Sequence, residues 1–350
     1  MPNLLDSFFK DVGIDLGTAN TLVYLKHRGL VVNEPSIAAI NNKTNQIMAV
    51  GDDAKKMLGR TPAHITVIRP LVSGVISDFE MTQEMLRQFL RRLHGGNWPF
   101  MGFRRAVIAI PNNLTEVERK SVEDAAVNAG CAKVYLVEEP VAAALGAGLP
   151  INEPTASLVI DIGGGTTDIA VISMGGTVIA RTLKVAGDRF NEDIIRFVRD
   201  EFKLLIGEPT AEYAKITVGS AIPLDERLEI PIRGRDLSSG LPREVIVKNS
   251  HVRLALAKSL TAITDTVLET IEATPPELVG DILRQGVYLC GGGAMLRGLD
   301  RLIEKETAVT THIAEDPLTC VVRGLGEIVE RFDAHRELLD NQLKPLEINL

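Results

Sequence analysis

Two short turns in this chain combine small residues with a carboxylate, a pattern that is suited to binding phosphate. The first turn lies between the apolar runs 12–16 and 21–25 and contains Asp15, Gly17, Thr18, Ala19 and Asn20. Small residues let the backbone approach a ligand closely, and a tight turn aims successive N–H groups at one anionic oxygen. A carboxylate at a strand end suits a magnesium ion held through water. Taken alone, the pattern also fits an ordinary β-turn beside a solvated aspartate.

The second turn repeats the first within the sequence LVIDIGGGTTDIAVI at residues 158–172. Three positions match in order, namely Asp15 with Asp161, Gly17 with Gly163, and Thr21 with Thr167. The turn itself consists of Gly163, Gly164, Gly165 and Thr166. Glycines between two strands weaken a sheet, so they indicate close approach of the backbone to a ligand. The repeat predicts two halves built on one plan, with a cleft between them.

Negative charge brackets the second turn at Asp161 and Asp168, and alone it would repel a phosphate. A cation between these carboxylates and the phosphates removes the conflict. We therefore take Asp15 and Asp161 as candidate magnesium ligands that act through water.

A third glycine run follows the apolar run 287–290 and consists of Gly291, Gly292, Gly293, Ala294, Met295 and Leu296. A strand followed by glycines and a helix N-terminus is a good seat for a nucleotide. The run lacks the spacing G-x-G-x-x-G, and the chain contains no G-x-x-x-x-G-K-[ST]. Rossmann and P-loop interpretations therefore fail on their own motifs.

The elements that must position these turns alternate between β-rich and helical runs, which predicts an α/β fold with a largely parallel sheet. Residues 106–110 and 133–137 read as strands. Between them, Thr115 and Glu118 match a capping box that starts a helix, and Gly130 would end that helix.

Composition narrows the class of protein. The chain has 350 residues, of which 45% are hydrophobic, and this suits two domains of middle size. A formal charge of -8 argues against a nucleic-acid surface. Cys131, Cys290 and Cys320 are far apart, so disulfides and a zinc site are not expected and a reducing compartment fits. Because no long apolar run or secretory signal is evident, we expect a cytoplasmic protein.

Together these motifs resemble the MreB family of bacterial actins, in the superfamily that includes actin, the large ATP-dependent chaperones and sugar kinases. The resemblance covers residues 11–330 and rests on the phrases IDLGTANTLVY, NEPS, GRTP, EEPVAAALGAGLPI, DIGGGTTD, GRDLSSGLPREV, TPPEL and GGGAMLRGLD. It implies an actin-like α/β fold in which two duplicated ribonuclease-H-like domains flank a nucleotide cleft, each with a smaller inserted subdomain. The expected boundaries are 1–35, 70–149 and 321–350 for the first large subdomain, 36–69 for its insertion, 150–187 and 251–320 for the second large subdomain, and 188–250 for its insertion.

The resemblance also implies that the ligands are ATP and Mg²⁺. The residues of the two turns would hold the terminal phosphates, and Glu139 and Thr166 would position the water that attacks the γ-phosphate. Glu212 and Lys215 would meet the ribose and adenine, while Gly292, Gly293, Ala294 and Met295 would close over the base. From the residues alone, Glu139 is better explained as a helix N-terminal carboxylate beside Pro140. The pair Glu212 and Lys215 is then a surface ion pair.

Two apolar features lie outside the nucleotide plan, and both suit a membrane surface. Leu4, Leu5, Phe8 and Phe9 share one helical face, and the loop at residues 94–103 carries Trp98, Phe100 and Met101. Trp and Phe favour the lipid headgroup boundary. Arginines flank the loop, namely Arg91, Arg92, Arg104 and Arg105. The alternative is that both segments pack onto the body of the protein.

The leading interpretation is a polymerising ATPase that forms paired filaments at the inner face of the cell membrane and works with the cell-wall elongation machinery to maintain cell shape. In the family, paired strands meet partly through the helix after Thr115. Val117 is our candidate contact, with core packing as the alternative. A sugar or metabolite kinase of the same superfamily is the main rival function, although no motif for a general base or a substrate pocket is evident. A chaperone ATPase would need a peptide-binding domain, for which we see no room.

Overall fold

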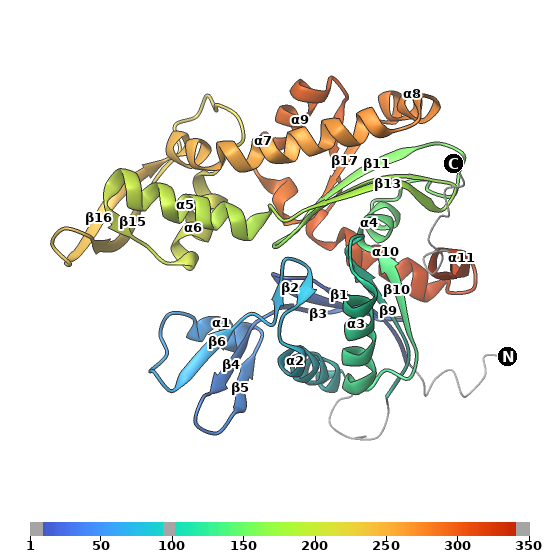
Figure 1. Ribbon diagram of the computed structural model, residues 1–350, viewed down its shortest axis with the longest axis horizontal. Helices are drawn as coiled ribbons and strands as arrows, with labels where there is room; N and C mark the ends of the chain where they lie inside the picture. The colour runs from blue at the N-terminus through green and yellow to red at the C-terminus, as the bar shows by residue number, and fades with distance from the viewer. Residues whose placement is uncertain (1–9, 94–101, 341–350) are drawn as a thin grey trace. The chain divides into compact units, whose positions relative to one another are not determined.

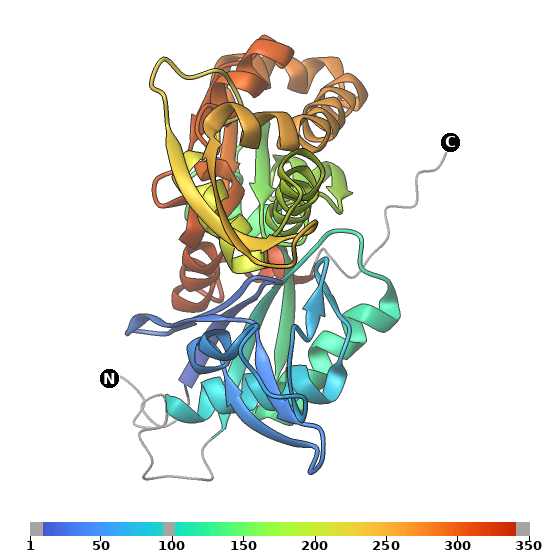
Figure 2. The same cartoon turned by 90° about the vertical axis from the view of Figure 1, so that its left-hand side faces the viewer.

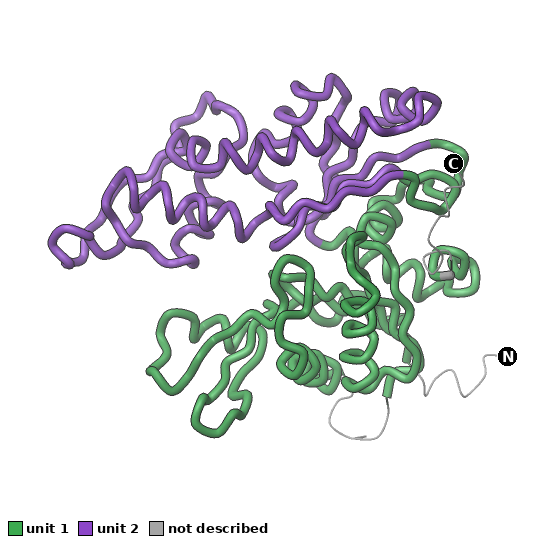
Figure 3. Tube along the Cα trace, in the orientation of Figure 1, with its two compact units in different colours: residues 1–155, 172–178, 319–350 green, residues 156–171, 179–318 purple. Residues whose placement is uncertain are grey.

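The structure is a computed structural model that describes residues 10–93 and 102–340. The chain divides into two compact units (Figure 3). Unit 1 comprises residues 1–155, 172–178 and 319–350, and unit 2 comprises residues 156–171 and 179–318. The chain therefore passes from one unit to the other several times, and one short segment of the second half, residues 172–178, belongs to unit 1.

Unit 1 is built on a five-stranded sheet in the order β10-β9-β1-β2-β3. Its strands are β1 (Lys10–Leu16), β2 (Asn20–Leu25), β3 (Gly29–Pro35), β9 (Phe103–Ile110) and β10 (Val134–Glu138). β9 pairs in parallel with β1 and β10, whereas β2 pairs antiparallel with β1 and β3. The prediction of a largely parallel sheet is therefore wrong. Short turns join β1, β2 and β3, and a short turn can only connect antiparallel neighbours.

Unit 2 repeats this plan in the order β13-β12-β11-β17-β18. The strands are β11 (Ser157–Ile162), β12 (Thr167–Ser173), β13 (Gly176–Leu183), β17 (Val287–Cys290) and β18 (Thr311–Ile313). In both sheets the first strand of the repeat is central, its two hairpin partners lie on one side, and two later parallel strands lie on the other. The strand order confirms the duplication that the matched turns predicted.

The helices of unit 1 are α1 (Asp52–Met57), α2 (Phe79–Arg92), α3 (Glu116–Ala129), α4 (Glu139–Gly146), α10 (Cys320–Glu330) and α11 (Arg336–Asp340). The predicted capping box is present, because the Thr115 side chain accepts from the Glu118 N–H and the Glu118 carboxylate accepts from the Thr115 N–H. Gly130 ends α3 with φ 116°, in the left-handed region that favours glycine. Both ends of this helix were therefore predicted correctly from local sequence.

Smaller sheets extend each unit. In unit 1, β4 (Ala38–Asn41), β5 (Gln46–Val50) and β6 (Ile65–Ile68) form a three-stranded sheet, and β7 (Leu71–Val72) pairs with β8 (Val75–Ile76). In unit 2, β14 (Leu204–Leu205), β15 (Glu229–Asp236) and β16 (Pro242–Lys248) form another, whose long β15–β16 hairpin is yellow in Figure 2. The four-subdomain division stays a prediction.

The helices of unit 2 are α5 (Gly187–Phe202), α6 (Glu208–Val218), α7 (Asn249–Ala273), α8 (Pro276–Gln285) and α9 (Leu299–Thr307), as labelled in Figure 1. α5 buries Phe190, Ile194 and Val198, which recur at every fourth position and so form one apolar face. α5 also packs on α7, where the Ser259 hydroxyl donates to the buried Asp193 carboxylate. Within the described residues, no helix combines the length and the apolar character that crossing a membrane requires.

Candidate functional site

In the first turn of the repeat, the backbone at Gly17 lies close to Asn20, and Ser36 bonds to the turn. A side chain at Gly17 would place its Cβ 2.8 Å from the Asn20 carbonyl oxygen, so only glycine fits. The Ser36 hydroxyl donates to the Gly17 carbonyl oxygen at 2.6 Å and lies 2.9 Å from the Thr21 hydroxyl. The turn from Gly17 to Ala19 is therefore rigid, and its backbone can approach a ligand as predicted.

The side chain of Thr18 has a partner that the sequence did not suggest. Its hydroxyl oxygen accepts from the backbone N–H of Gly74, in the turn between β7 and β8, at 2.9 Å. Thr18 is only 6% exposed. The bond uses an acceptor site of the hydroxyl and leaves its O–H hydrogen able to donate, so both the side chain and the backbone at this position could contact a phosphate. Gly74 has φ 76°, and the dipeptide Ser73-Gly74 marks a turn, but nothing in the sequence placed that turn beside Thr18.

Asp15 lies near the end of β1, opposite Leu22 of β2. Burial raises the pKa of its carboxyl group to about 7. A nearby cation would stabilise the ionised form of this buried carboxylate, because an opposite charge favours ionisation. The position and the raised pKa both fit the predicted role as a magnesium ligand through water.

The second turn is held by the start of helix α5. The Gly163 N–H donates to the Thr166 carbonyl at 2.9 Å and closes the turn. The Gly187 N–H then donates to the Gly163 carbonyl at 3.1 Å, and the Asp188 N–H donates to the Gly164 carbonyl at 2.8 Å. Gly187 contacts the predicted phosphate turn, and sequence reasoning missed it. Its only local signal is Ala186-Gly187-Asp188 immediately before the apolar periodicity of α5.

Glu212 and Lys215 lie on one face of α6, as their spacing predicted, and they contact the same helix start. Their side chains form an ion pair at 2.7 Å. Lys215 Nζ also donates to the Gly187 carbonyl at 3.1 Å, and Asn191 donates its side-chain N–H to Glu212 at 2.7 Å. The ion pair expected from the residues alone is therefore present, with Lys215 14% exposed and Glu212 42% exposed. Unit 2 thus brings the predicted ribose-side residues against the predicted phosphate turn.

The third glycine run packs directly on the end of β11. A Cβ on Gly291 would lie 2.4 Å from an Asp161 carboxylate oxygen, and a Cβ on Gly293 would lie 2.2 Å from the Ile162 side chain. Residues Gly292–Met295 form a 3-10 helix, and the α-helix begins only at Leu299. The predicted direct step from glycines to an α-helix is therefore wrong, because Gly291, with φ 78°, and the close packing on Ile162 impose a tighter turn. Met295 is 59% exposed.

Glu139 and Thr166 fall in different units. Glu139 is the first residue of α4 and belongs to unit 1, whereas Thr166, which is 7% exposed, belongs to unit 2. Glu139 lies at a helix N-terminus next to Pro140, which confirms the interpretation of Glu139 as a helix N-terminal carboxylate. This does not conflict with a role in catalysis.

Helix α4, which carries Glu139, crosses α10 at very short range (Figure 1). A Cβ on Gly146 would lie 1.8 Å from the Cys320 carbonyl oxygen, and a Cβ on Gly324 would lie 1.8 Å from the Ala142 carbonyl oxygen. The two backbones are therefore in direct contact, and two glycines make this possible. The crossing fixes the helix that presents Glu139.

The residues proposed to contact a membrane lie outside the described residues, namely Leu4, Leu5, Phe8, Phe9, Trp98, Phe100 and Met101. All four arginines that flank the loop are described, and three of them, Arg92, Arg104 and Arg105, have carboxylate partners. Arg104 and Arg105 bond to Asp11 at 2.8 and 2.6 Å, and Arg92 bonds to Glu34 at 2.5 Å. Burial alone would raise the pKa of Asp11, but the two guanidinium groups outweigh it and hold the pKa below its usual value. The positive charge beside the loop is thus partly neutralised within the protein.

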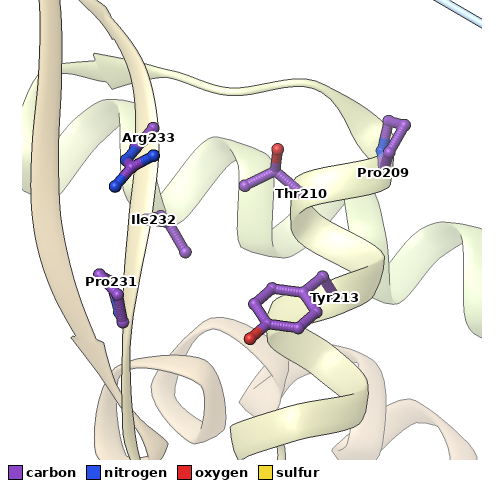
Figure 4. A pocket seen from close by; sticks show the side chains of 6 residues that line it. All are labelled: Pro209, Thr210, Tyr213, Pro231, Ile232 and Arg233. Atoms are coloured by element: carbon purple, nitrogen blue, oxygen red, sulfur yellow. The ribbon is translucent and has the colours of Figure 1, made fainter.

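Another face of α6 borders an open pocket that none of the predicted site residues lines (Figure 4). Its volume is about 350 Å³, and its walls are Pro209, Thr210, Tyr213, Pro231, Ile232 and Arg233. Ile232 is buried at its floor, and Tyr213 is 54% exposed. The pocket therefore shares no residue with the predicted nucleotide site.

The fold and the paired glycine turns define the class: this is an actin-like protein. In comparisons with solved structures, the chain is similar to MreB5 of Spiroplasma citri bound to ADP, with a TM-score of 0.89 and 41% identity over 94% of this chain and 98% of that one. The same protein bound to AMPPNP matches at 40% identity, with a TM-score of 0.89, over the same shares of the two chains.

Sequence comparisons make the assignment more specific. Residues 9–337 match the family described as MreB/Mbl protein. The chain is 48% identical to the cell shape-determining protein MreB of Escherichia coli K12 over 94% of this chain and 95% of that one. It is 47% identical to the cell shape-determining protein Mbl of Bacillus subtilis over 93% of this chain and 97% of that one. The chain belongs to the MreB/Mbl family, which confirms the resemblance and favours a bacterial actin over a sugar or metabolite kinase.

Proposed function

We propose that this chain is an ATP-dependent bacterial actin that polymerises into paired filaments at the inner face of the cell membrane and guides cell-wall synthesis to maintain cell shape. The observation that carries the proposal is the duplicated hairpin. Each of its turns has a backbone held by the surrounding protein and kept clear of bulky side chains. Membership of the MreB/Mbl family supports it, because the relatives are named cell shape-determining proteins.

The nucleotide is proposed to contact residues of both units. Backbone N–H groups of Gly17, Thr18, Ala19 and Asn20, and of Gly163, Gly164 and Gly165, would bind the terminal phosphates. Glu212 and Lys215 would meet the ribose and adenine, and Gly292 to Met295 would close over the base. Binding of ADP and AMPPNP by MreB5 of Spiroplasma citri supports this assignment.

A magnesium ion fits the carboxylates of the two turns. Asp15 and Asp161 would hold it through water, and the raised pKa of Asp15 is consistent with a site that a cation completes. The ion would supply positive charge against the phosphates. The chain itself supplies turns without side-chain bulk, because a Cβ on Gly17 would meet the Asn20 carbonyl oxygen and a Cβ on Gly291 would meet the Asp161 carboxylate.

Hydrolysis of ATP is proposed to depend on Glu139 and Thr166. Phosphoryl transfer is catalysed mainly by positioning and charge stabilisation, so a carboxylate acceptor and a hydroxyl are sufficient to orient a water molecule. Glu139 is suited to this task because the contact between α4 and α10 fixes its helix.

Electron microscopy of the purified protein is the direct test of the proposed function. With ATP we expect paired filaments, and without nucleotide we expect few or none. A kinase of the same superfamily would instead remain unassembled and would transfer phosphate to a small acceptor. Absence of filaments together with such a transfer would overturn the proposal.

The paired filaments are expected to depend on Val117. This residue is 75% exposed on α3, so the alternative of core packing is wrong. We expect Val117→Glu to leave the fold intact but to convert paired filaments into single ones, because a charge buried without a partner in the strand contact is costly. Filament width in electron micrographs is the measurement.

The matched control for this variant is Val127→Glu on the same helix. Val127 is 49% exposed, and it lies ten residues further along α3, about 15 Å along the helix axis and about 80° around it from Val117. We expect Val127→Glu to keep paired filaments. If Val117→Glu filaments stay paired as well, the strand contact lies elsewhere on the surface.

Membrane binding is expected to depend on the loop residues Trp98 and Phe100 and to require polymerisation. Burying one large side chain contributes about 1.5–3 kcal/mol at best, so a monomer should bind weakly. A filament repeats the patch, and linked weak sites act together. We expect the double variant Trp98→Ser with Phe100→Ser to polymerise with ATP but to lose most co-sedimentation with liposomes.

A matched control for the loop variant is Met48→Ser, which removes an apolar side chain that is 53% exposed on β5. It should pellet with liposomes as the unaltered protein does. If the loop variant polymerises and pellets equally well, Trp98 and Phe100 do not anchor the filament. Because three of the four flanking arginines, Arg92, Arg104 and Arg105, are already paired, we expect anionic lipid to increase liposome binding only modestly.

A further inference from the structure

The turn between β12 and β13 is bound to the loop that follows α4. Its central residues, Met174 and Gly175, have φ 52° and 73°, the conformation of a tight hairpin turn. The Met174 N–H donates to the Glu153 carbonyl at 3.1 Å, and the Gly175 N–H donates to the Ile151 carbonyl at 2.7 Å. All four residues belong to unit 1. The far end of the hairpin that starts at the second phosphate turn is therefore fixed in unit 1.

Two residues beyond this turn, Thr177 bonds to the start of α4. Its hydroxyl donates to a carboxylate oxygen of Glu138 at 2.6 Å, and both side chains are half-buried. A hydroxyl bonded to a carboxylate at this distance is a charge-assisted hydrogen bond, roughly twice as strong as a neutral one. Both residues lie in unit 1, so the bond is internal to that unit.

Glu138 occupies the junction between strand β10 and helix α4. It is the last residue of β10 and the N-cap of α4, yet its side chain makes no capping hydrogen bond. Pro140, at the start of the helix, has no N–H to offer it. The Glu138 carboxylate instead accepts the hydrogen bond from Thr177, so its position is restrained by β13 and not by a capping bond to the helix.

The residue that follows Glu138 is Glu139, the proposed catalytic residue. The backbone of the junction is fixed by pairing of Glu138 with Ile110 of β9, and α4 is fixed by its close crossing with α10. The bond from Thr177 adds a side-chain restraint at the residue adjoining Glu139. An error of a fraction of an ångström at this point would displace the Glu139 carboxylate from its productive position.

We propose that Thr177 is a positioning residue for ATP hydrolysis, which it supports by holding Glu138 and so the direction in which α4 presents Glu139. The contact between Thr177 and Glu138 lies within unit 1, near the turn that joins β12 and β13. This inference rests on the proposed ATP hydrolysis.

The decisive variant is Thr177→Val, which keeps the β-branch and approximate shape of the side chain and replaces the hydroxyl with a methyl group. We expect kcat for ATP hydrolysis to fall roughly three- to tenfold, because a mispositioned group slows the chemical step. The KM and the affinity for an unhydrolysed ATP analogue should not change, since Thr177 is not among the proposed nucleotide contacts. Thr177→Ser retains the hydroxyl and should restore kcat. Turnover is expressed per amount of pelleted protein, so that differences in assembly do not enter.

Two further variants test the partner and the strand. In Glu138→Ala the acceptor is lost, so adding Thr177→Val to it should lower kcat no further, as expected for two residues that act through one bond. Arg181→Ala, on the same strand β13, removes an exposed ion pair with Glu269 at 3.6 Å and should leave kcat unchanged. Thermal melting of each variant accompanies the kinetics.

The outcomes separate this inference from the proposed function. If the unaltered protein does not hydrolyse ATP, the proposed function and this inference both fail. If it does, but Thr177→Val turns over equally fast, only the inference fails. A loss in Thr177→Val that includes nucleotide affinity, or that Thr177→Ser does not restore, would show a general structural effect and would also overturn it.

Discussion

Replacing Glu139 by alanine is expected to leave ATP binding intact and to slow ATP hydrolysis about a hundredfold or more, the scale of a lost positioning or acid–base group. Glu139 begins α4, and its helix is fixed by backbone contact with α10. The position of the helix is therefore set by α10, and Glu139 is not among the proposed nucleotide contacts, so its removal should not weaken nucleotide binding. Phosphate release from assembled protein and the affinity for an ATP analogue are the two measurements.

A conservative change at the same position separates orientation from charge. Glu139→Gln keeps an oxygen that can accept a hydrogen bond from water but removes the negative charge. If orientation is sufficient, as the positioning nature of phosphoryl transfer suggests, this variant should retain far more activity than Glu139→Ala. Turnover of Glu139→Ala equal to that of the unaltered protein would remove Glu139 from the mechanism.

Adding one methyl group at the crossing of α4 and α10 is expected to destabilise the protein by about 3 kcal/mol, at the upper end for overpacking. In Gly146→Ala the new Cβ would lie 1.8 Å from the Cys320 carbonyl oxygen, and in Gly324→Ala it would lie 1.8 Å from the Ala142 carbonyl oxygen. Both obstacles are backbone atoms, so no side-chain rotation relieves the clash and the helices must separate. Urea denaturation monitored by circular dichroism measures the loss.

The same substitution at Gly280 provides the control. Gly280 lies within α8, its Cβ would meet nothing within 4 Å, and its backbone is not in the left-handed region. Gly280→Ala should therefore stabilise the protein by about 0.5–1 kcal/mol, because alanine loses less conformational freedom in a helix than glycine does. If Gly146→Ala proved as stable as Gly280→Ala, the two backbones would not be in the close contact described.

Local sequence determined much of this protein. The strands that flank both turns, the capping box at Thr115 and the helix end at Gly130 were all predicted, because each depends on residues that are neighbours in the chain. The duplication was also evident from the matched turns, and the strand order of the two sheets confirms it. The spacing of Glu212 and Lys215 was sufficient to place them on one helix face, since a helix brings residues three apart together.

Only the tertiary structure determined the contacts between residues far apart in the chain. Gly187 meets Gly163, Gly74 meets Thr18, and Thr177 meets Glu138, and no periodicity or motif encodes these pairs. Whether Val117 faced solvent or the core also required the packing of α3, because an isolated valine in a charged stretch suits either. The sequence thus specified the turns and helix ends through local backbone preferences. Chain topology specified which of those elements touch, because long-range contacts follow from how the strands and helices are connected and packed.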